Sequence, residues 1–179
     1  DLADEQALRA LIRASRPDLI VNPAAYTAVD RAEDEAGGQL ATAVNAIAPG
    51  VMGEEAARLG AAVIHYSTDY VFDGLKATPY VETDPTAPLG AYGRSKRDGE
   101  LALMRSTPRH IVLRTSWVVG AHGNNFAKTM LRLAAERDEL RVVSDQFGAP
   151  TSAALIADVT AHLVRQLQRA GTEPFPYGL

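Results

Sequence analysis

The sequence of 179 residues contains no cysteine, and its formal net charge is only −4. The absence of cysteine excludes disulfide bonds, thiolate metal sites and cysteine nucleophiles, and it fits the cytoplasmic location that we expect. Without an excess of basic charge, neither nucleic acid nor an anionic membrane is an expected partner. No apolar run approaches the roughly 20 residues of a membrane-spanning helix, and no signal-peptide pattern opens the chain. The 46% hydrophobic and 22% charged residues are typical of an ordinary globular protein.

Helical and extended patterns alternate along the chain. Helical spacing predicts helices at residues 1–15, 39–59, 92–104, 126–139 and 155–168, the second of them with a kink near Pro49-Gly50. Short runs rich in Val, Ile and Leu predict strands at 18–22, 62–67, 110–114 and 140–143. This alternation predicts an α/β fold, in which a Rossmann-like, doubly wound parallel sheet has helices on both faces. Residues 73–91 read as a long irregular loop, and such loops are usually functional.

Tyr92 and Lys96 stand four residues apart in a predicted helix. Positions i and i+4 lie on one face of a helix, so the phenol and the ammonium should point into the same space. A cation beside a phenol lowers the pKa of the phenol from about 10, which a tyrosine needs for proton exchange near neutral pH. Thr68 follows a predicted strand, and its hydroxyl can hold the oxygen that receives the proton. The three residues together are typical of a carbonyl reductase.

Other polar groups follow the predicted strands, at the sheet edge where ligands of such folds bind. These groups are 24–27, 67–70 and 115–117. Each candidate also has a plain structural interpretation. Tyr92 with Lys96 can be a solvated helix pair, Asn45 an ordinary polar helix residue, Trp117 a core residue and Asn125 a turn ahead of a helix. The histidines at 65, 110 and 122 lie on different predicted elements, so we read them as structural or exposed and expect no metal cluster.

At these residues the sequence resembles the extended short-chain dehydrogenase/reductase family. The similarity is closest to the branch that reduces dTDP-linked 4-keto-6-deoxysugars. Each matching segment is short and weak when taken singly, but their common order is specific and extends over nearly the whole chain. The segments are 22–30, 67–72, 92–96, 114–117, 123–130 and 145–151.

The resemblance implies a role for each candidate residue. Tyr92 would donate a proton to the C4 carbonyl, Lys96 would hold the nicotinamide ribose, and Thr68 would hydrogen-bond the reacting oxygen. The cofactor, NADPH or NADH, would contact Asp1, Leu2, Ala25, Tyr26, Thr27, Tyr66, Tyr92 and Lys96. The nucleotide-sugar substrate would contact Thr68, Asp69, Trp117 and Asn125, with the loop 146–151 as a weaker candidate. Some family members are reported as metal-bridged dimers, so Mg and a homodimer are implied by resemblance alone.

The implied reaction is reduction of the C4 ketone of dTDP-4-dehydro-6-deoxy-L-mannose to dTDP-L-rhamnose. Tyr70 stands where the dehydratases of the family carry Glu, and this favours simple reduction over elimination of water. Another nucleotide-sugar epimerase or reductase of the family remains an alternative. So does a non-catalytic role, like that of the regulatory subunit of methionine adenosyltransferase, which resembles the same reductases.

The sequence departs from the family in two features, and one is that the carboxy-terminal part, which builds much of the sugar pocket in the family, is missing after Leu179. The other is that the sequence contains no strand followed by a Gly-rich turn and a helix, the pattern that cradles a pyrophosphate. We therefore expect residues 1–179 to form one partial NAD(P)-binding domain, incomplete at both ends, with substrate-contacting segments around 120–152. A polypeptide limited to these residues is expected to bind dinucleotide poorly.

Overall fold

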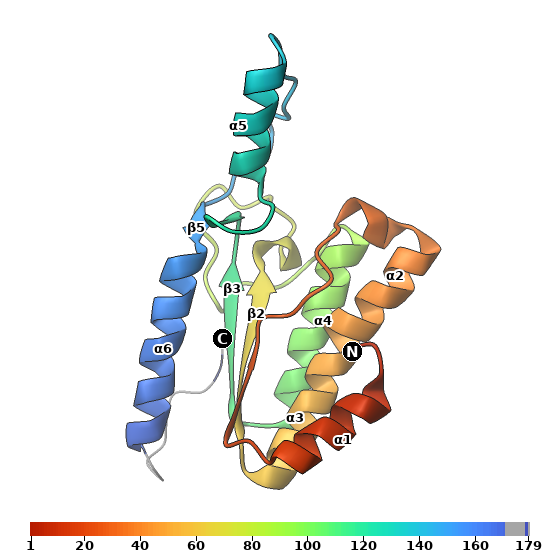
Figure 1. Cartoon of the computed structure of the whole chain (residues 1–179), viewed down its shortest axis with the longest axis vertical. Coiled ribbons are helices and arrows are strands. Elements are labelled where there is room, and N and C mark those ends of the chain that lie inside the picture. Colours follow the sequence, from red (N-terminus) through yellow and green to blue (C-terminus); the bar gives the residue numbers. More distant parts are fainter. Residues whose placement is uncertain (171–177, 179) are drawn as a thin grey trace. The chain divides into compact units, whose positions relative to one another are not determined.

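The computed structural model describes residues 1–170 and residue 178, and it divides into two compact units (Figure 1). The first unit comprises Asp1–Arg114 with Pro176–Leu179, and the second comprises Thr115–Phe175. The predicted substrate-contacting segments around 120–152 fall in the second unit. The prediction of a single partial domain over 1–179 stays a prediction.

The first unit contains a sheet with the strand order β1-β2-β3. Strands β1 and β2 are parallel, with Asn22 opposite His65, and the arrows of β2 and β3 point the same way in Figure 1. Its elements in chain order are α1 (Glu5–Ser15), β1 (Leu19–Asn22), the 3-10 helix η1 (Asp30–Glu33), α2 (Glu35–Ala41), the π-helix η2 (Thr42–Ile47), α3 (Ala48–Leu59), β2 (Ala62–Thr68), the 3-10 helix η3 (Asp69–Val71), α4 (Ala91–Ser106) and β3 (His110–Thr115).

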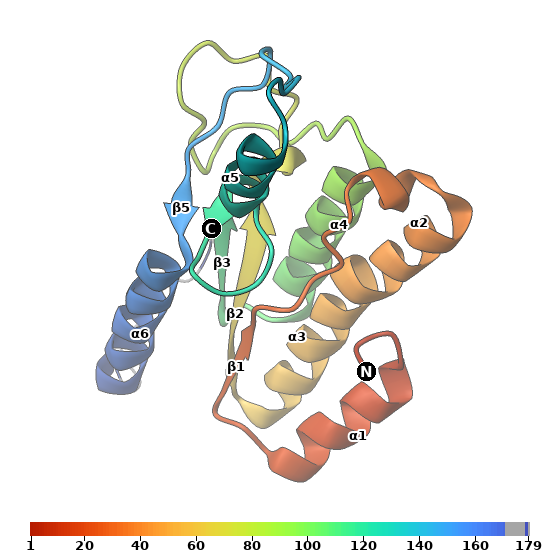
Figure 2. The same ribbon diagram turned by 45° about the horizontal axis from the view of Figure 1, so that its top comes forward.

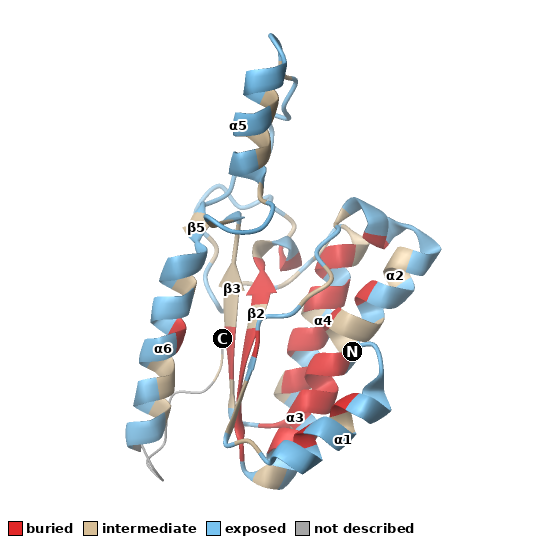
Figure 3. Ribbon diagram, in the orientation of Figure 1, coloured by how far each residue is buried: buried red, intermediate tan, exposed pale blue. Residues whose placement is uncertain are grey.

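The core of the first unit lies where α3 and α4 pack against β2 and against each other. Helix α1 packs against α3, and Figures 1 and 2 show these helices side by side. Buried residues concentrate on α3, α4 and β2 (Figure 3). Burial of such apolar surface contributes about 25 cal/mol per Å² and is the main favourable term in folding. The largest clusters are Leu8, Ile12, Ala48, Val51 and Met52, and Ala56, Ala61, Val63, Leu103 and Val112.

The bounds of two predicted elements are explained by local chemistry. The first helix begins at Glu5, because Asp4 caps it and accepts a hydrogen bond from the backbone N–H of Ala7 at 2.9 Å. Gly60 ends α3 with a left-handed φ of 72°, a conformation that glycine adopts without steric cost. The irregular loop after η3 is confirmed, since neither helix nor strand is present between Val71 and Ala91.

The predicted helical stretch at 39–59 is confirmed, because α2, the π-helix η2 and α3 follow one another without a break. Its middle turn is π-helical, which the sequence pattern did not predict, and the kink near Pro49 stays a prediction. Pro49 lies in the first turn of α3, directly after η2, and it has no N–H to bond a carbonyl of the preceding helical turn. The irregular turn therefore precedes the proline, and it contains the buried residue Asn45. Short π-helical turns are frequent at functional sites.

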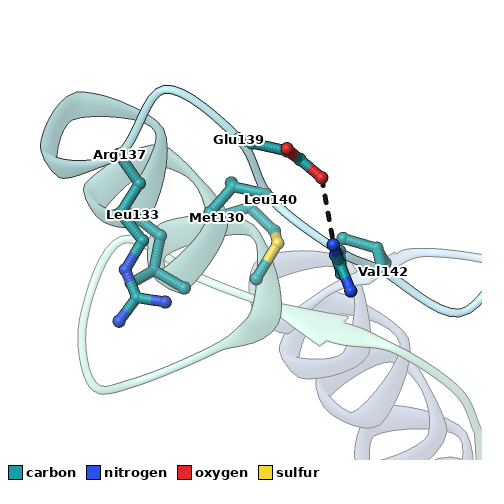
Figure 4. Close-up of a pocket in the computed structure, with 7 residues that line it drawn as sticks. Met130, Leu133, Arg137, Glu139, Leu140 and Val142 are labelled. Carbon is teal, nitrogen blue, oxygen red and sulfur yellow. Dashed lines mark hydrogen bonds and ion pairs between the residues drawn. The ribbon is translucent and has the colours of Figure 1, made fainter.

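The second unit contains β4 (Val118–Val119), α5 (Phe126–Glu136), β5 (Thr151–Ser152) and α6 (Ala153–Ala170), with β4 and β5 parallel. The predicted strand at 140–143 is absent from the described residues, and α5 ends three residues earlier than predicted. Leu140 and Val142 share a hollow with Met130 and Leu133 of α5 (Figure 4). These apolar side chains thus face a helix and do not join a sheet. None of the predicted site residues lines this hollow.

Within the residues that the structure describes, no helix is both long and apolar enough to cross a membrane.

Candidate active site

The three predicted catalytic residues are all buried in the first unit, around the end of β2 and the start of α4. Thr68 is 6% exposed, Tyr92 is 9% exposed and Lys96 is 2% exposed. Thr68 is the last residue of β2, and its hydroxyl accepts the backbone N–H of Tyr70 at 3.2 Å. That hydrogen bond turns the chain into η3 and holds the hydroxyl at the strand end.

The phenol of Tyr92 lies against groups from the turn that follows β2. Its ring meets the ring of Tyr70 edge to face, with centroids 5.6 Å apart and planes at 78°. Thr68 hydrogen-bonds Tyr92 and also donates to Asp69 Oδ1 at 3.2 Å. Burial raises the pKa of Asp69, and the hydrogen bond from Thr68 opposes this rise. Thr68, Asp69 and Tyr92 are therefore brought together by the fold.

The ammonium of Lys96 is held by β2. Its Nζ donates to the carbonyl oxygen of Tyr66 at 2.6 Å and lies 3.4 Å from Nε2 of His65. Burial lowers the pKa of Lys96 to about 8, and the negative charge of Glu100 partly offsets this. The lysine therefore loses its proton much closer to neutral pH than an exposed lysine does.

The structure contradicts one expectation about this pair. Lys96 was expected to lower the pKa of Tyr92, but the pKa of Tyr92 is raised above 10.0. Burial is the largest cause, the nearby Asp69 and Tyr70 add to it, and the hydrogen bond with Thr68 opposes it. Desolvation disfavours the phenolate more than the surroundings favour it. The phenol is therefore held in its protonated form, as a proton donor requires.

Two glycines let α4 approach the site closely. A Cβ at Gly93 would lie 2.2 Å from the carbonyl oxygen of Tyr70, and a Cβ at Gly99 would lie 2.0 Å from that of Asn45. Both distances are far below van der Waals contact, so any side chain there would push the helix away. Sequence reasoning read the motif around Tyr92 but did not identify these contacts.

Asn45 joins the predicted cofactor segment to α4. Its Oδ1 accepts the backbone N–H of Tyr26 at 2.8 Å, and its Nδ2 donates to the Tyr26 carbonyl at 2.9 Å and to Ser95 Oγ at 3.0 Å. Tyr26 also packs on the cluster that contains Tyr92. Sequence reasoning missed this function and read Asn45 as an ordinary polar residue. The available signal was a poor helix former inside a run of Ala, Val and Ile.

The other predicted cofactor residues of the first unit have simpler surroundings. Ala25 is half-buried and Thr27 is exposed, so this segment borders solvent. Asp1 is exposed, and its carboxylate accepts the backbone N–H of Ala3 at 2.9 Å. Leu2 packs against the apolar cluster between α1 and α3. Its side chain therefore serves the core of the unit.

Trp117 and Asn125 lie in the second unit. Trp117 has a φ of 43°, which is an outlier for a bulky residue, and its indole packs where Gly148 leaves room for it. The Asn125 side chain caps α5, because its Oδ1 accepts the N–H of Lys128 at 3.0 Å and its Nδ2 donates to the carbonyl of Gly120 at 2.8 Å. Structural functions thus account for these two hydrogen bonds of Asn125. The substrate contacts of Trp117 and Asn125 stay predictions.

A metal site was not expected from the sequence. Over the described part of the chain, no group of three or more His, Cys, Asp or Glu side chains is placed to hold a metal ion. Mg stays an implication of resemblance.

The chain is similar to known reductases over most of its length. It is 53% identical over 165 residues to dTDP-4-dehydrorhamnose reductase of Escherichia coli (strain K12), a match that covers 92% of this chain and 54% of the relative. It is 51% identical to the reductase of that name from Burkholderia thailandensis, covering 94% of this chain and 56% of the relative.

Solved structures show the same fold. A dTDP-4-dehydrorhamnose reductase from Clostridium acetobutylicum superposes with a TM-score of 0.89 at 37% identity, covering 99% of this chain and 60% of that structure. A dTDP-4-dehydrorhamnose reductase from Bacillus anthracis in complex with NADP gives a TM-score of 0.85 at 38% identity, covering 92% of this chain and 58% of that structure. These superpositions confirm the predicted Rossmann-like α/β fold.

The chain spans about half the length of the curated relatives that it matches. The family model of the RmlD substrate binding domain matches residues 1–177. The chain therefore belongs to the RmlD substrate binding domain family.

Proposed function

We propose that this chain carries the proton-donor part of an NAD(P)H-dependent reductase that acts on the C4 ketone of dTDP-4-dehydro-6-deoxy-L-mannose. The observation that carries the proposal is the buried set of Thr68 at the end of β2 and Tyr92 and Lys96 at the start of α4. Relatives about half identical to the chain bear the name dTDP-4-dehydrorhamnose reductase, and a structural relative binds NADP. The product would be dTDP-L-rhamnose.

Residues of the first unit fit a nicotinamide cofactor. The segment 25–27, which borders solvent, is held in place by the hydrogen bonds of Asn45 to Tyr26. The Nζ of Lys96 donates one N–H to the carbonyl of Tyr66 and has further N–H donors for a ligand. Ala25, Tyr26, Thr27, Tyr66, Tyr92 and Lys96 would hold the group, with Asp1 and Leu2 toward its adenine. When bound, a reduced nicotinamide supplies a hydride to the ketone carbon.

The residues of the chain would then complete the reduction. Thr68 donates a hydrogen bond to the ketone oxygen, and Tyr92 transfers its phenolic proton to that oxygen as negative charge develops there. The oxygen becomes the C4 hydroxyl, and the phenolate that remains on Tyr92 takes up a proton from solvent before the next turnover. The high pKa of the buried phenol keeps the proton in place until it is needed.

Tyr70 supports reduction over elimination. Its ring lies edge-on against Tyr92, at the position where a dehydratase would carry a second carboxylic acid. A phenol there is a much weaker acid than a carboxyl group. The nucleotide sugar is thus proposed to contact Thr68, Asp69, Trp117 and Asn125 without loss of water. The homodimer and the cytoplasmic location stay predictions.

The decisive experiment measures NADPH and NADH oxidation with the ketosugar nucleotide, using the natural gene product that carries this sequence. Tyr92→Phe should lower kcat by about 100-fold or more, since it removes the proton donor. Tyr80→Phe is the matched control, because the Tyr80 hydroxyl bonds Asp73 in the loop before α4, and it should keep its activity. Near-normal turnover by Tyr92→Phe would refute the assignment, and no turnover by the natural protein would favour a non-catalytic role.

A further inference from the structure

Three buried polar side chains form a row from β1 to α4, and the last of them is the proposed catalytic residue Lys96. Asn22 is 4% exposed, His65 is 1% exposed and Lys96 is 2% exposed. Asn22 Nδ2 lies 3.1 Å from His65 Nδ1, and His65 Nε2 lies 3.4 Å from Lys96 Nζ. Asn22 and His65 are direct partners in the register of β1 and β2. The imidazole of His65 thus lies between the amide of Asn22 and the amino group of Lys96.

The hydrogen bonds of Asn22 define the tautomer of the ring. Its Oδ1 accepts the backbone N–H of Ala24 at 3.2 Å, so its amide nitrogen must face His65. An amide NH₂ can only donate, and Nδ1 of the ring must therefore accept. Burial and the charge of Lys96 lower the pKa of His65 to about 3, so the ring is neutral and carries one proton. That proton is on Nε2, the atom that faces Lys96.

In this arrangement the amino group of Lys96 can donate no hydrogen bond on the side that faces His65. The Nε2–H of His65 and the N–H groups of Lys96 are all donors, so they cannot share a hydrogen bond across the 3.4 Å. The carbonyl of Tyr66 accepts one Nζ proton at 2.6 Å. The remaining N–H bonds of Lys96 must then point away from the ring. Glu100, one turn further along α4, is the charged group that favours the ammonium.

We propose that His65 is a positioning residue for Lys96, with Asn22 holding the ring in the Nε2–H form. The ring closes one side of the amino group and directs its remaining N–H bonds to the other side, where the cofactor ribose is proposed to lie. The inference rests on the proposed function, in which Lys96 holds that ribose. The plainer alternative is that His65 only fills space between β1 and α4.

Nuclear magnetic resonance of ¹⁵N-labelled histidine in this chain tests the tautomer directly. His65 should give the signals of a neutral Nε2–H ring and should not titrate near the usual pKa of about 6.5. Asn22→Asp should convert the ring to the Nδ1–H form, because a carboxylate only accepts. A natural ring in the Nδ1–H form, or an unchanged tautomer in Asn22→Asp, would overturn the function assigned to Asn22.

Kinetics of the natural gene product test the positioning. His65→Leu fills similar space without an N–H, and kcat should fall about tenfold or more, as expected for a displaced catalytic group. The KM for NADPH should rise while the KM for the sugar nucleotide stays unchanged. His65→Gln places an N–H near the former Nε2 and should recover most of the loss. Equal losses in the two variants would overturn the positioning function.

Ile64→Val is the structural control, because Ile64 is fully buried in the same strand. It should lower the Tm with no change in kcat. If His65→Leu lowers only the Tm, as Ile64→Val does, His65 merely fills space. Tyr92→Phe is measured alongside, since full turnover by that variant would instead refute the proposed function. If Tyr92→Phe is inactive while His65→Leu is fully active, the positioning function of His65 is rejected and the proposed function is not.

Discussion

At the scale of single residues, burial decides the chemistry of the site. The same desolvation that keeps the phenol of Tyr92 protonated lowers the pKa of Lys96 to about 8 and that of His65 to about 3. A protein rarely buries a lysine without a use for it, because the charged form loses its hydration. Perturbed groups of this kind are characteristic of functional sites.

The pKa of Lys96 predicts a pH limit to activity. The ammonium should be needed for ribose binding, so kcat/KM should fall as the pH rises through about 8. A pH–rate profile measures this limb. Lys96→Arg keeps its charge at all these pH values, so the fall near pH 8 should disappear in whatever activity it retains. If kcat/KM of Lys96→Arg falls in the same way, a group other than Lys96 causes the fall.

The lysine also predicts a pH dependence of stability. Its pKa in the folded state, about 8, lies below the ordinary 10.5. The burial penalty is therefore fully present below about pH 8 and is relieved as the pH rises toward 10.5. Urea unfolding at several pH values should show the natural protein gaining stability relative to Lys96→Met across this window. A constant difference between the two proteins would contradict the shifted pKa.

At the scale of secondary structure, helix α4 is positioned by contacts that permit no side chain. Gly99 lies against the π-helix that holds Asn45, and Gly93 lies against the turn that holds Tyr70. The π-helix places the Asn45 amide on the backbone of Tyr26. The element that carries Tyr92 and the segment proposed to hold the cofactor are thus tied through one irregular turn.

Gly99→Ala should therefore displace α4 and damage both stability and activity. The added methyl would meet the Asn45 carbonyl at 2.0 Å, and overpacking of this kind costs about 1–3 kcal/mol. Chemical denaturation and NADPH oxidation measure the two effects. Gly38→Ala is a matched helical control, because its Cβ would meet the Ala32 carbonyl at 3.1 Å and needs only a small adjustment. Equal stability of the two variants would show that α4 tolerates the methyl group.

Helix α1 is attached to α3 through Glu55. Three arginines surround this carboxylate, with Arg9, Arg13 and Arg58 at 3.0, 2.7 and 3.0 Å. Hydrogen bonds, first from Arg13, lower the pKa of Glu55 to about 2. The carboxylate is covered by these partly exposed arginine side chains and not by deep core, so solvent screens the pairs.

Glu55→Gln should lower the stability by about 1–2 kcal/mol near neutral pH, since it removes the charge that the three arginines share. The pKa of Glu55 is lowered from 4.5, so its contribution is present above that pH and is lost as the pH falls toward 2. Thermal unfolding at descending pH should show the natural protein and Glu55→Gln converging. A gap that persists at low pH would indicate lost packing instead of lost charge.

At the scale of the whole molecule, the chain supplies the residues proposed to hold one side of the cofactor, and its sequence contains no Gly-rich turn after a predicted strand. The backbone N–H groups of such a turn supply much of the binding to a pyrophosphate. A polypeptide limited to these 179 residues should therefore bind NADPH weakly. Isothermal titration calorimetry measures this, and tight binding by the 179 residues would refute the prediction.

The sequence by itself determined the order of β1, β2 and β3 with the main helices between them, the Tyr-x-x-x-Lys pair on one helix and the Thr at the end of β2. These features follow from local periodicity, turn residues and spacing, which neighbouring residues set among themselves. Tertiary structure decided which distant groups meet. Asn22 reaches His65 across 43 residues, and Asn45 reaches Ser95 across 50. The raised pKa of Tyr92, opposite to the expected direction, likewise depends on burial by segments far apart in the chain, which no local pattern records.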